Sequence, residues 1–393
     1  MKPANPIFAD MGTTIFEVMS RLAAEHGAVN LGQGFPDGNG PDDVRDRAQA
    51  FLADRPNQYP SMWGVPELRE AVAAHNTRFH GLSVDPTREV LVTSGATEAL
   101  ASCLFGLIAP GDEVVMIEPL YDSYLPIVRQ AGGIPKLVRL QPPGWTLPRS
   151  ELAAAFSAKT KLIILNSPMN PTGKVFDADD LGFIAGLLVK HDAYAVCDEV
   201  YEHLVFDGRK HIPLITLPNM RTRCLRIGSA GKTFSLTGWK VGYITGPADL
   251  MQPVAKAHQF LTFTTAPNLQ RAVAYGLGKD DAYFAGLATD LSAKRDLLAA
   301  GLSNLGFKVL PTAGTYFICA DFTALSGSED DAAFCRRLTI DAGVAAIPIS
   351  IFYEGDAPRS FIRFAFCKDT TMLTEALTRL ARAFPQTAKA ARV

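Results

Sequence analysis

The residue with the most distinctive chemical setting in this chain is Lys232, which follows a short apolar segment, 224–227, within a run of small residues. A lysine amine in such a place can condense with a carbonyl to form a Schiff base. A second apolar segment, 193–197, ends at Asp198. A Schiff-base amine and a carboxylate that can hold a protonated pyridine nitrogen are the two groups that pyridoxal phosphate requires of a protein. The pair therefore predicts a site for that cofactor.

Polar residues also follow the other apolar segments. Ser94 to Thr97 opens a helical pattern with small residues, whose free backbone N–H groups suit a phosphate, and Asn170 lies in the loop after 161–165. Each residue alone has a plainer interpretation, since an Asp after a strand often caps a helix and Asn-Pro often makes a turn. Ligands bind beyond the carboxyl ends of strands in open α/β sheets, so the joint occurrence favours one shared site.

Two short stretches resemble nucleotide-binding motifs, but neither fits its motif fully. Gly231-Lys232-Thr233 resembles the end of a nucleotide phosphate loop, but that motif needs glycine at position 226, where Arg226 stands. Gly32-Gln33-Gly34 resembles a dinucleotide fingerprint, but Asp37 occupies the third glycine position and no βαβ pattern surrounds it.

Composition narrows the class of protein. A chain of 393 residues with 48% hydrophobic and 20% charged residues is typical of a soluble globular protein with two domains. A net charge of -2 disfavours a nucleic-acid or membrane partner, and no apolar run reaches membrane-spanning length. The 6 cysteines form no Cys-x-x-Cys pair and are expected to be reduced thiols in a cytoplasmic protein. His75 and His80 have the wrong spacing for a metal and are expected at the surface, so no metal is predicted.

The patterning predicts an α/β fold with two domains. Helical and near-continuously apolar strand segments alternate, which is typical of a buried, mainly parallel sheet with helices on both faces. The expected strands are 89–93, 113–117, 161–165, 193–197, 224–229 and 241–244, and the expected helices are 67–79, 97–107, 122–130 and 178–190.

The pattern changes after about residue 279. A long helix over 281–305 is followed by antiparallel-looking strands and a terminal helix, expected at 307–310, 315–319, 344–347, 361–366 and 372–383. We therefore predict a large domain over 46–285, a smaller α+β domain over 286–393, and an N-terminal arm, 1–45, that forms part of the small domain.

Over almost its whole length the chain resembles the class I pyridoxal-phosphate aminotransferases of fold type I. It is most similar to the group that contains kynurenine/glutamine, methionine and some N-succinyldiaminopimelate aminotransferases. The segments that carry the resemblance are 30–37, 57–60, 94–100, 170–173, 198–201, 229–242 and 361–364. The resemblance implies a seven-stranded-type sheet in the large domain, a homodimer with shared active sites, and ping-pong transfer of an amino group from an L-amino acid to a 2-oxo acid.

The resemblance also implies roles for single residues. Lys232 would form the Schiff base with pyridoxal 5'-phosphate and later act as the general base for the proton shift. Asp198 would pair with the pyridine nitrogen, and Tyr201 and Asn170 would hydrogen-bond the phenolic oxygen of the cofactor. Tyr121 would stack on the ring. The phosphate would be held by Gly95, Ala96, Thr97, Ser229 and Lys240, with Tyr59 reaching it from the other subunit.

The same resemblance implies a substrate site. Arg363 would clamp the substrate carboxylate, with Gly34 and Asn170 beside it, while Phe16 and Phe263 would line the side-chain pocket. A plainer interpretation of Arg363 is a structural arginine whose stem packs while its head reaches solvent. A guanidinium flanked by apolar residues needs a partner, however, and a carboxylate can meet it with two hydrogen bonds.

Two departures bear on the finer identity. Lys240 stands where most of the class has arginine, although the resembled group also uses lysine there. Thr97 and Thr264 replace an aromatic residue and a histidine of the eukaryotic kynurenine enzymes, which disfavours kynurenine as substrate. A C–S β-lyase, an N-succinyldiaminopimelate-specific aminotransferase and a catalytically silent binding protein stay open as alternatives. Retention of Lys232, Asp198 and Arg363 disfavours the last.

Overall fold

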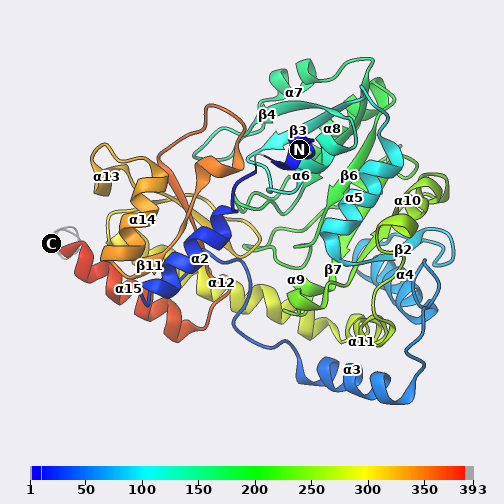
Figure 1. Cartoon of the computed structure of the whole chain (residues 1–393), viewed down its shortest axis with the longest axis horizontal. Coiled ribbons are helices and arrows are strands. Elements are labelled where there is room, and N and C mark those ends of the chain that lie inside the picture. The colour runs from blue at the N-terminus through cyan, green and yellow to red at the C-terminus, as the bar shows by residue number, and fades with distance from the viewer. Residues whose placement is uncertain (1, 10, 386–393) are drawn as a thin grey trace.

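The computed structural model describes residues 2–9 and 11–385 of the chain. Figure 1 shows a larger lobe built on the central part of the chain and a smaller lobe that combines the C-terminal part with α2 (Ile15–Glu25). None of the helices in the described ranges is both long and apolar enough to cross a membrane.

The larger lobe contains a seven-stranded sheet in the order β2-β8-β7-β6-β5-β3-β4. Its strands are β2 (Val90–Thr93), β3 (Glu113–Glu118), β4 (Ile134–Arg139), β5 (Thr160–Asn166), β6 (Tyr194–Asp198), β7 (Cys224–Ser229) and β8 (Gly242–Thr245). The pairs from β4 through β3, β5 and β6 to β7 are parallel, whereas β8 runs antiparallel to both β7 and β2. The predicted α/β fold with a mainly parallel sheet is therefore confirmed.

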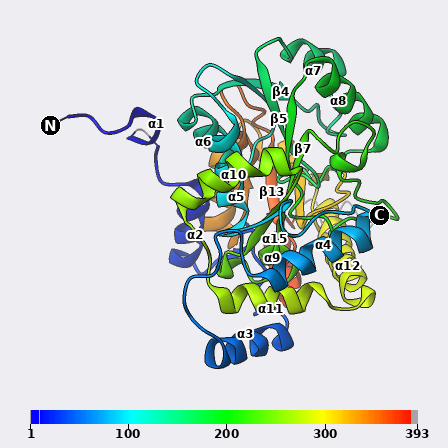
Figure 2. The same ribbon diagram turned by 90° about the vertical axis from the view of Figure 1, so that its right-hand side faces the viewer.

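Helices cover both faces of this sheet, as expected because its strands other than β4 are buried along almost their whole length. On one side α5 packs against α10, and α11 packs on α4 and on α3, which lies at the edge of the lobe (Figure 2). The helices of this lobe are α3 (Asp42–Asp54), α4 (Pro66–His80), α5 (Gly95–Leu107), α6 (Tyr124–Gln130), α7 (Arg149–Ala155), α8 (Ala178–Lys190), α9 (Ala230–Thr233), α10 (Ala248–Leu261) and α11 (Pro267–Leu277), with short 3-10 turns η1 (Leu214–Thr216) and η2 (Thr237–Trp239).

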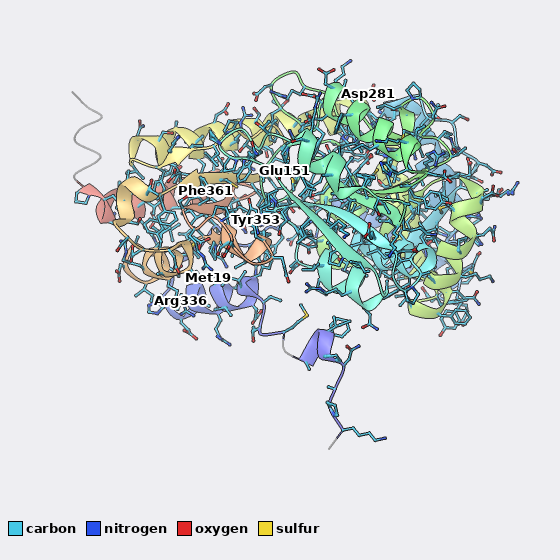
Figure 3. All side chains as sticks on the ribbon, turned by 90° about the horizontal axis from the view of Figure 1, so that it is seen from above. Met19, Glu151, Asp281, Arg336, Tyr353 and Phe361 are labelled. Carbon is cyan, nitrogen blue, oxygen red and sulfur yellow. The ribbon has the colours of Figure 1, made fainter. Side chains whose placement is uncertain are left out.

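The smaller lobe is built on a four-stranded antiparallel sheet in the order β12-β13-β10-β9. Its elements are α12 (Asp281–Asn304), β9 (Lys308–Val309), β10 (Phe317–Asp321), α13 (Thr323–Ser326), α14 (Asp331–Asp341), β11 (Val344–Ala345), β12 (Ile347–Pro348), η3 (Ile349–Phe352), β13 (Phe361–Ala365) and α15 (Thr370–Ala383). Seen from above, the buried side chain of Phe361 lies inside this lobe, while Arg336 lies on its outer face (Figure 3).

Two elements from the N-terminal part of the chain pack on the smaller lobe. β1 (Val29–Asn30) pairs in parallel with β11, and α2 packs against α14. The first helix, α1 (Pro6–Ala9), lies beside α6 on an extended arm (Figure 2). α12 begins beside the large lobe and ends against α15, where a Cβ on Gly301 would meet the Leu377 side chain at 2.4 Å. The domain limits at residues 45 and 285 stay a prediction.

Some expected elements differ in the structure. The segment 344–347 is not one strand but two, because β11 pairs with β1 and β12 pairs with β13. β4 is a partly exposed edge strand that contains Pro135 and Lys136, so it lacks the continuous apolar run that marks the other strands. The helices α2, α3, α7, α10, α11 and α14 were also not predicted.

The expectation that His75 and His80 are surface residues is wrong. His75 is buried and the His80 side chain is only 7% exposed: His75 Nε2 lies 2.8 Å from Nε2 of His203, and His80 Nε2 lies 2.7 Å from a Glu202 carboxylate oxygen. Burial lowers the pKa of His75 to about 3 and that of His203 to about 4. Ligand atoms of His75, Glu202 and His203 lie within 4.8 Å of one another, but the Arg226 guanidinium bound to the same carboxylate disfavours a cation there.

Arg226 is the centre of this buried network. Its guanidinium contacts the carboxylates of Glu199 and Glu202 and donates to Asn76 Oδ1 at 2.8 Å. Burial alone would raise the pKa of Glu202, but the Arg226 charge outweighs it and holds that pKa well below its ordinary value. The network anchors the segment from Asp198 to His203, which follows β6.

Replacing Arg226 by leucine leaves two buried carboxylates without their cation. We expect Arg226→Leu to lower the free energy of unfolding by about 3–5 kcal/mol, measured by urea denaturation. Arg129→Leu, which removes the partner of Glu354 from a half-exposed ion pair, is the matched control and should cost at most about 1 kcal/mol. Equal losses in the two variants would contradict the assignment of the network as a structural anchor.

Candidate active site

A cavity of about 360 Å³ lies where the ends of β5, β6 and β7 face the smaller lobe. All of the predicted site residues except Tyr59 and Phe263 line it. Those residues are Phe16, Gly34, Gly95, Ala96, Thr97, Tyr121, Asn170, Asp198, Tyr201, Ser229, Lys232, Lys240 and Arg363. The structure therefore brings together residues from both lobes and from the N-terminal arm.

Lys232 lies on α9, the short helix that directly follows β7. Its amine donates a hydrogen bond to the hydroxyl of Tyr316 at 2.9 Å and lies 5.7 Å from the centre of the Tyr201 ring. Burial lowers the pKa of Lys232 to about 8, although the negative charge of Asp198 opposes the shift. An amine with such a pKa has a substantial neutral fraction near pH 8, which a nucleophile or a base requires.

Asp198 is the last residue of β6 and does not cap a helix. Its carboxylate accepts a hydrogen bond from the hydroxyl of Tyr124 at 2.5 Å, while Asn166 donates to its backbone carbonyl at 2.9 Å. Burial raises the pKa of Asp198, and the bond from Tyr124 opposes that rise. Asn166 also accepts from the backbone N–H of Asn170 at 2.8 Å, so one side chain fixes two neighbouring strand ends.

The first turn of α5 forms an anion cradle with Lys240. Gly95 has φ +80°, and a Cβ built there would lie 3.4 Å from Lys240 Nζ, so the ammonium sits directly against the start of the helix. A Cβ on Gly231 would lie 3.5 Å from the hydroxyl of Ser229, on the same side of the cavity. Unpaired N–H groups of a first helical turn, a helix dipole and an ammonium together suit a phosphate.

Arg363 lies on β13 and is 1% exposed, so the interpretation with a solvated head is wrong. It donates to Asn170 Oδ1 and to the Gly32 carbonyl, both at 2.8 Å, and its guanidinium lies 4.0 Å from the centre of the Phe317 ring. Its Nε has no partner, and within the described residues no carboxylate lies at ion-pair distance from it. Burial lowers its pKa to about 10. A buried cation without a counter-ion suits a ligand carboxylate.

Aromatic rings close the remaining walls. Phe16 lies 5.3 Å from the Arg363 guanidinium, and Tyr201 packs edge-on against Tyr316 with 5.2 Å between ring centres. Burial raises the pKa of Tyr121 to about 12 and that of Tyr201 further, so both hydroxyls keep their protons at neutral pH. These rings limit the access of water to the cavity.

Tyr59 and Phe263 are absent from the lining of this cavity. Tyr59 is 84% exposed and packs edge-on against Phe263 with 5.6 Å between ring centres. Phe260 and Leu261 add further exposed apolar surface to the same stretch of chain. A cluster of large exposed apolar residues is typical of a protein interface.

Sequence reasoning missed several residues of the site. The sequence pattern predicts Tyr124 and Tyr316 as ordinary core aromatic residues, and nothing in their spacing indicates a polar contact. The position of Asn166 could have predicted a role in the site, because Asn166 is the last residue of its strand, as Asp198 is of the next strand. Gln33 and Ser123 also line the cavity, and the Ser123 hydroxyl has no partner among the described residues.

Comparisons with known proteins agree over nearly the whole chain. A family model described as aminotransferase class I and II matches residues 27–380. The chain is 46% identical over 379 residues to a probable N-succinyldiaminopimelate aminotransferase, DapC, of Mycobacterium tuberculosis, covering 94% of this chain and 95% of that protein. It is 40% identical over 370 residues to the methionine aminotransferase of Escherichia coli, covering 94% and 96%. A solved structure of the Mycobacterium tuberculosis N-succinyldiaminopimelate aminotransferase matches with a TM-score of 0.94 and 45% identity, covering 97% and 100%.

The lowered pKa of Lys232 predicts a stability change in the cofactor-free protein. The pKa is about 8 when folded against 10.5 for an unperturbed lysine, so below pH 8 the buried ammonium destabilises the fold by up to about 3 kcal/mol. Between pH 8 and 10.5 the unfolded chain binds more protons, and this penalty fades as pH rises. Lys232→Met should therefore raise the free energy of unfolding at pH 7 by about 2–3 kcal/mol, and the gain should vanish above pH 10.5.

The exposed Lys256 provides the control, since Lys256→Met should change the free energy of unfolding by less than about 0.5 kcal/mol at every pH. A gain for Lys232→Met that does not depend on pH would show that better packing, rather than the removal of a buried charge, is responsible.

Proposed function

The chain belongs to the class I and II aminotransferases and is a transaminase; we propose that it uses pyridoxal 5'-phosphate to move the amino group of an L-amino acid to a 2-oxo acid in two half-reactions. The observation that carries the proposal is one cavity that holds the Lys232 amine, the Asp198 carboxylate and the unpaired Arg363 guanidinium. These are the groups needed for Schiff-base formation, support of a pyridinium and recognition of an α-carboxylate.

The residues present fit the cofactor. Lys232 would bind it covalently, Asp198 would face its pyridine nitrogen, and Tyr121 would lie against its ring. Tyr201 and Asn170 would hydrogen-bond its phenolic oxygen. The phosphate would occupy the cradle formed by Gly95, Ala96, Thr97, Ser229 and Lys240, where a Cβ on Gly95 would crowd the ammonium. When bound, pyridoxal phosphate supplies an electron sink for the charge that develops at the substrate Cα.

The chain's own groups supply the proton transfers and the orientation. Lys232 Nζ would accept the proton that leaves the substrate Cα and would release it at the carbon that gains a hydrogen in the 1,3-proton shift, which its lowered pKa allows near neutral pH. The Asp198 carboxylate stabilises a positive charge placed before it, because burial strengthens electrostatic interactions that water would screen. Arg363 fixes the substrate carboxylate, so the Cα–H bond is held toward the lysine.

We propose a homodimer in which Tyr59 and Phe263 complete the neighbouring cavity. Two observations support it: both rings lie outside their own cavity, and they belong to an exposed apolar cluster with Phe260 and Leu261. Exposed aromatic clusters of this kind are costly in a monomer and gain stability when a second copy covers them.

Mixed dimers test this arrangement. Lys232→Ala and Tyr59→Ala proteins should each have little activity alone, but random mixing should restore about a quarter of wild-type activity, because half of the dimers regain one intact site. Sedimentation velocity checks that dimers form. If Tyr59 serves the cavity of its own protomer, every site in the mixture stays defective and no activity returns.

We propose that the protein works in the cytoplasm. All six cysteines are free and buried. A protein without disulfides is compatible with a reducing compartment, which supports the proposal that it works in the cytoplasm.

We consider two kinds of amino donor as candidate substrates. The 46% identity to the probable N-succinyldiaminopimelate aminotransferase favours that donor as a second candidate beside amino acids with uncharged side chains. A C–S β-lyase would share the same cofactor groups. Purified enzyme should be incubated with a panel of donors, including methionine, glutamine, kynurenine and N-succinyl-L,L-diaminopimelate, with and without 2-oxo acids.

The panel separates the functions by product. A transaminase converts donor to 2-oxo acid only while an acceptor 2-oxo acid is consumed in equal amount. A β-lyase releases pyruvate and ammonia from cysteine conjugates without any acceptor. A silent member binds donors but yields neither product, and that result would overturn the proposal.

Arg363→Ala should weaken every donor and acceptor, since all of them share the carboxylate that the guanidinium binds. We expect kcat/KM to fall for each substrate by an amount that corresponds to a loss of about 2–5 kcal/mol of transition-state stabilisation. The absorbance of the cofactor should not change. Arg363→Lys should recover only part of the loss, because an ammonium cannot make the two parallel hydrogen bonds. A loss confined to one class of side chain would show that Arg363 recognises something other than the shared carboxylate.

A further inference from the structure

The loop that follows β1 is attached to the smaller lobe through its carbonyl groups. Ala365 N–H donates to the Leu31 carbonyl at 2.6 Å, and Arg363 donates to the Gly32 carbonyl at 2.8 Å. Two further donors continue the row: the Tyr316 hydroxyl bonds the Gly34 carbonyl at 2.6 Å, and Lys368 Nζ bonds the Phe35 carbonyl at 2.9 Å. The loop 31–35, which lines the cavity at Gly34, therefore has its position set by β13 and by the residues before β10.

Tyr316 differs from the other donors because it also contacts Lys232. The lysine amine donates to the Tyr316 oxygen at 2.9 Å, and the same hydroxyl donates a hydrogen bond to the Gly34 carbonyl at 2.6 Å. The two bonds form a continuous chain from Lys232 through Tyr316 to Gly34. Tyr316 is 1% exposed and its ring is packed between Tyr201 and Phe317, with ring centres at 5.2 and 4.7 Å, so the hydroxyl has little freedom to move.

The other end of this chain is equally constrained. A Cβ on Gly34 would lie 2.5 Å from the Phe317 ring, so only glycine allows the loop to approach the strand this closely. The close approach brings the Gly34 carbonyl within reach of the Tyr316 hydroxyl, whose oxygen remains able to accept from the lysine.

We propose that Tyr316 is a positioning residue for transamination: it holds the Lys232 amine whenever that amine is free and couples its orientation to the substrate-side loop at Gly34. This inference rests on the proposed function. Because one N–H of Lys232 is directed to Tyr316, the lone pair of the neutral amine is directed elsewhere, toward the cavity in which the substrate Cα would lie.

The coupling also has a consequence for binding. Gly34 lies beside the Arg363 end of the cavity, where the substrate carboxylate would bind. A substrate that fixes the position of the loop 31–35 therefore also fixes the position of Tyr316. Tyr316 in turn orients the lysine that must receive the Cα proton. Loss of the hydroxyl should lower kcat more than it raises KM, since the carboxylate partner Arg363 is retained.

Tyr316→Phe tests the proposal by removing one oxygen atom. Tyr243→Phe is the matched control, because Tyr243 is equally buried and its hydroxyl has no partner among the described residues. The main readout is the pKa of the Lys232 amine in cofactor-free protein, obtained from the pH dependence of trace labelling with acetic anhydride and mass spectrometry of the Lys232 peptide. Urea unfolding of both variants reports any loss of fold.

The expected shift has a definite sign. The Tyr316 oxygen accepts from the amine and favours its charged form, so its removal should lower the Lys232 pKa by about one unit below the wild-type value. The other groups around the amine are the same in both proteins: Asp198, Tyr201, Lys240, Arg363 and Cys367. Tyr243→Phe should leave the pKa unchanged. With cofactor and substrates, kcat of Tyr316→Phe should fall by about tenfold or more.

Tyr316→His gives a second variant if phenylalanine disturbs the fold. An imidazole has one acceptor and one donor nitrogen, so it can replace both bonds and should hold the Lys232 pKa between those of wild type and Tyr316→Phe. An unchanged Lys232 pKa in Tyr316→Phe, or an equal change in Tyr243→Phe, overturns the proposal. Because the labelling needs no cofactor, that result would leave the proposed transaminase activity standing, whereas failure of the donor and acceptor panel would not alter the labelling.

Discussion

The organisation of this site depends on the cost of burying charged groups away from water. Lys232, Asp198 and Arg363 all line one cavity between two lobes. Burial lowers the pKa of Lys232 and of Arg363 and raises the pKa of Asp198, so in each case it favours the neutral form. Each charge is only partly compensated within the chain: Asp198 by a tyrosine hydroxyl, Lys232 by another, and Arg363 by an amide and a carbonyl oxygen. Groups held in this condition interact strongly with a ligand that carries the complementary charges.

The two-lobed architecture supplies these groups from separate sources. The ends of β5, β6 and β7 provide Asn170, Asp198 and Lys232, because parallel strands present their carboxyl ends at one edge of the sheet. β13 of the smaller lobe provides Arg363, which is bonded to Asn170 across the boundary between the lobes. A substrate carboxylate bound to Arg363 therefore contacts both lobes, which offers a physical basis for coupling substrate binding to closure of the cavity.

Much of this site could be predicted from the sequence, because strand-end signals are local. Asp198 and Asn170 follow apolar runs, Lys232 follows small residues, and Gly95 opens a helix with a positive φ that glycine readily adopts. The resemblance to known aminotransferases added Arg363, whose strand pattern alone also allowed a solvated head. The structure removes that alternative, since Arg363 is 1% exposed as a whole residue.

The remainder depends on contacts between residues far apart in the chain. β1 and β11 have two residues each and lie more than three hundred residues apart, so no periodic pattern predicts their pairing. Spacing rules cannot predict the buried network of His75, Glu202 and Arg226, because its members come from α4, from the turn after β6 and from β7. Tyr316 reads as a core aromatic, and only its position between Lys232 and Gly34 indicates a polar role.

We propose Lys232 as the covalent attachment point of pyridoxal phosphate. Purified protein should be reduced with borohydride, digested, and its peptides examined by mass spectrometry for the pyridoxyl-phosphate mass on lysine. We expect the tag on the peptide that contains Lys232 and its loss in Lys232→Ala. A tag on Lys240 or another lysine in the native protein, or no tag in protein that binds the cofactor, would contradict it.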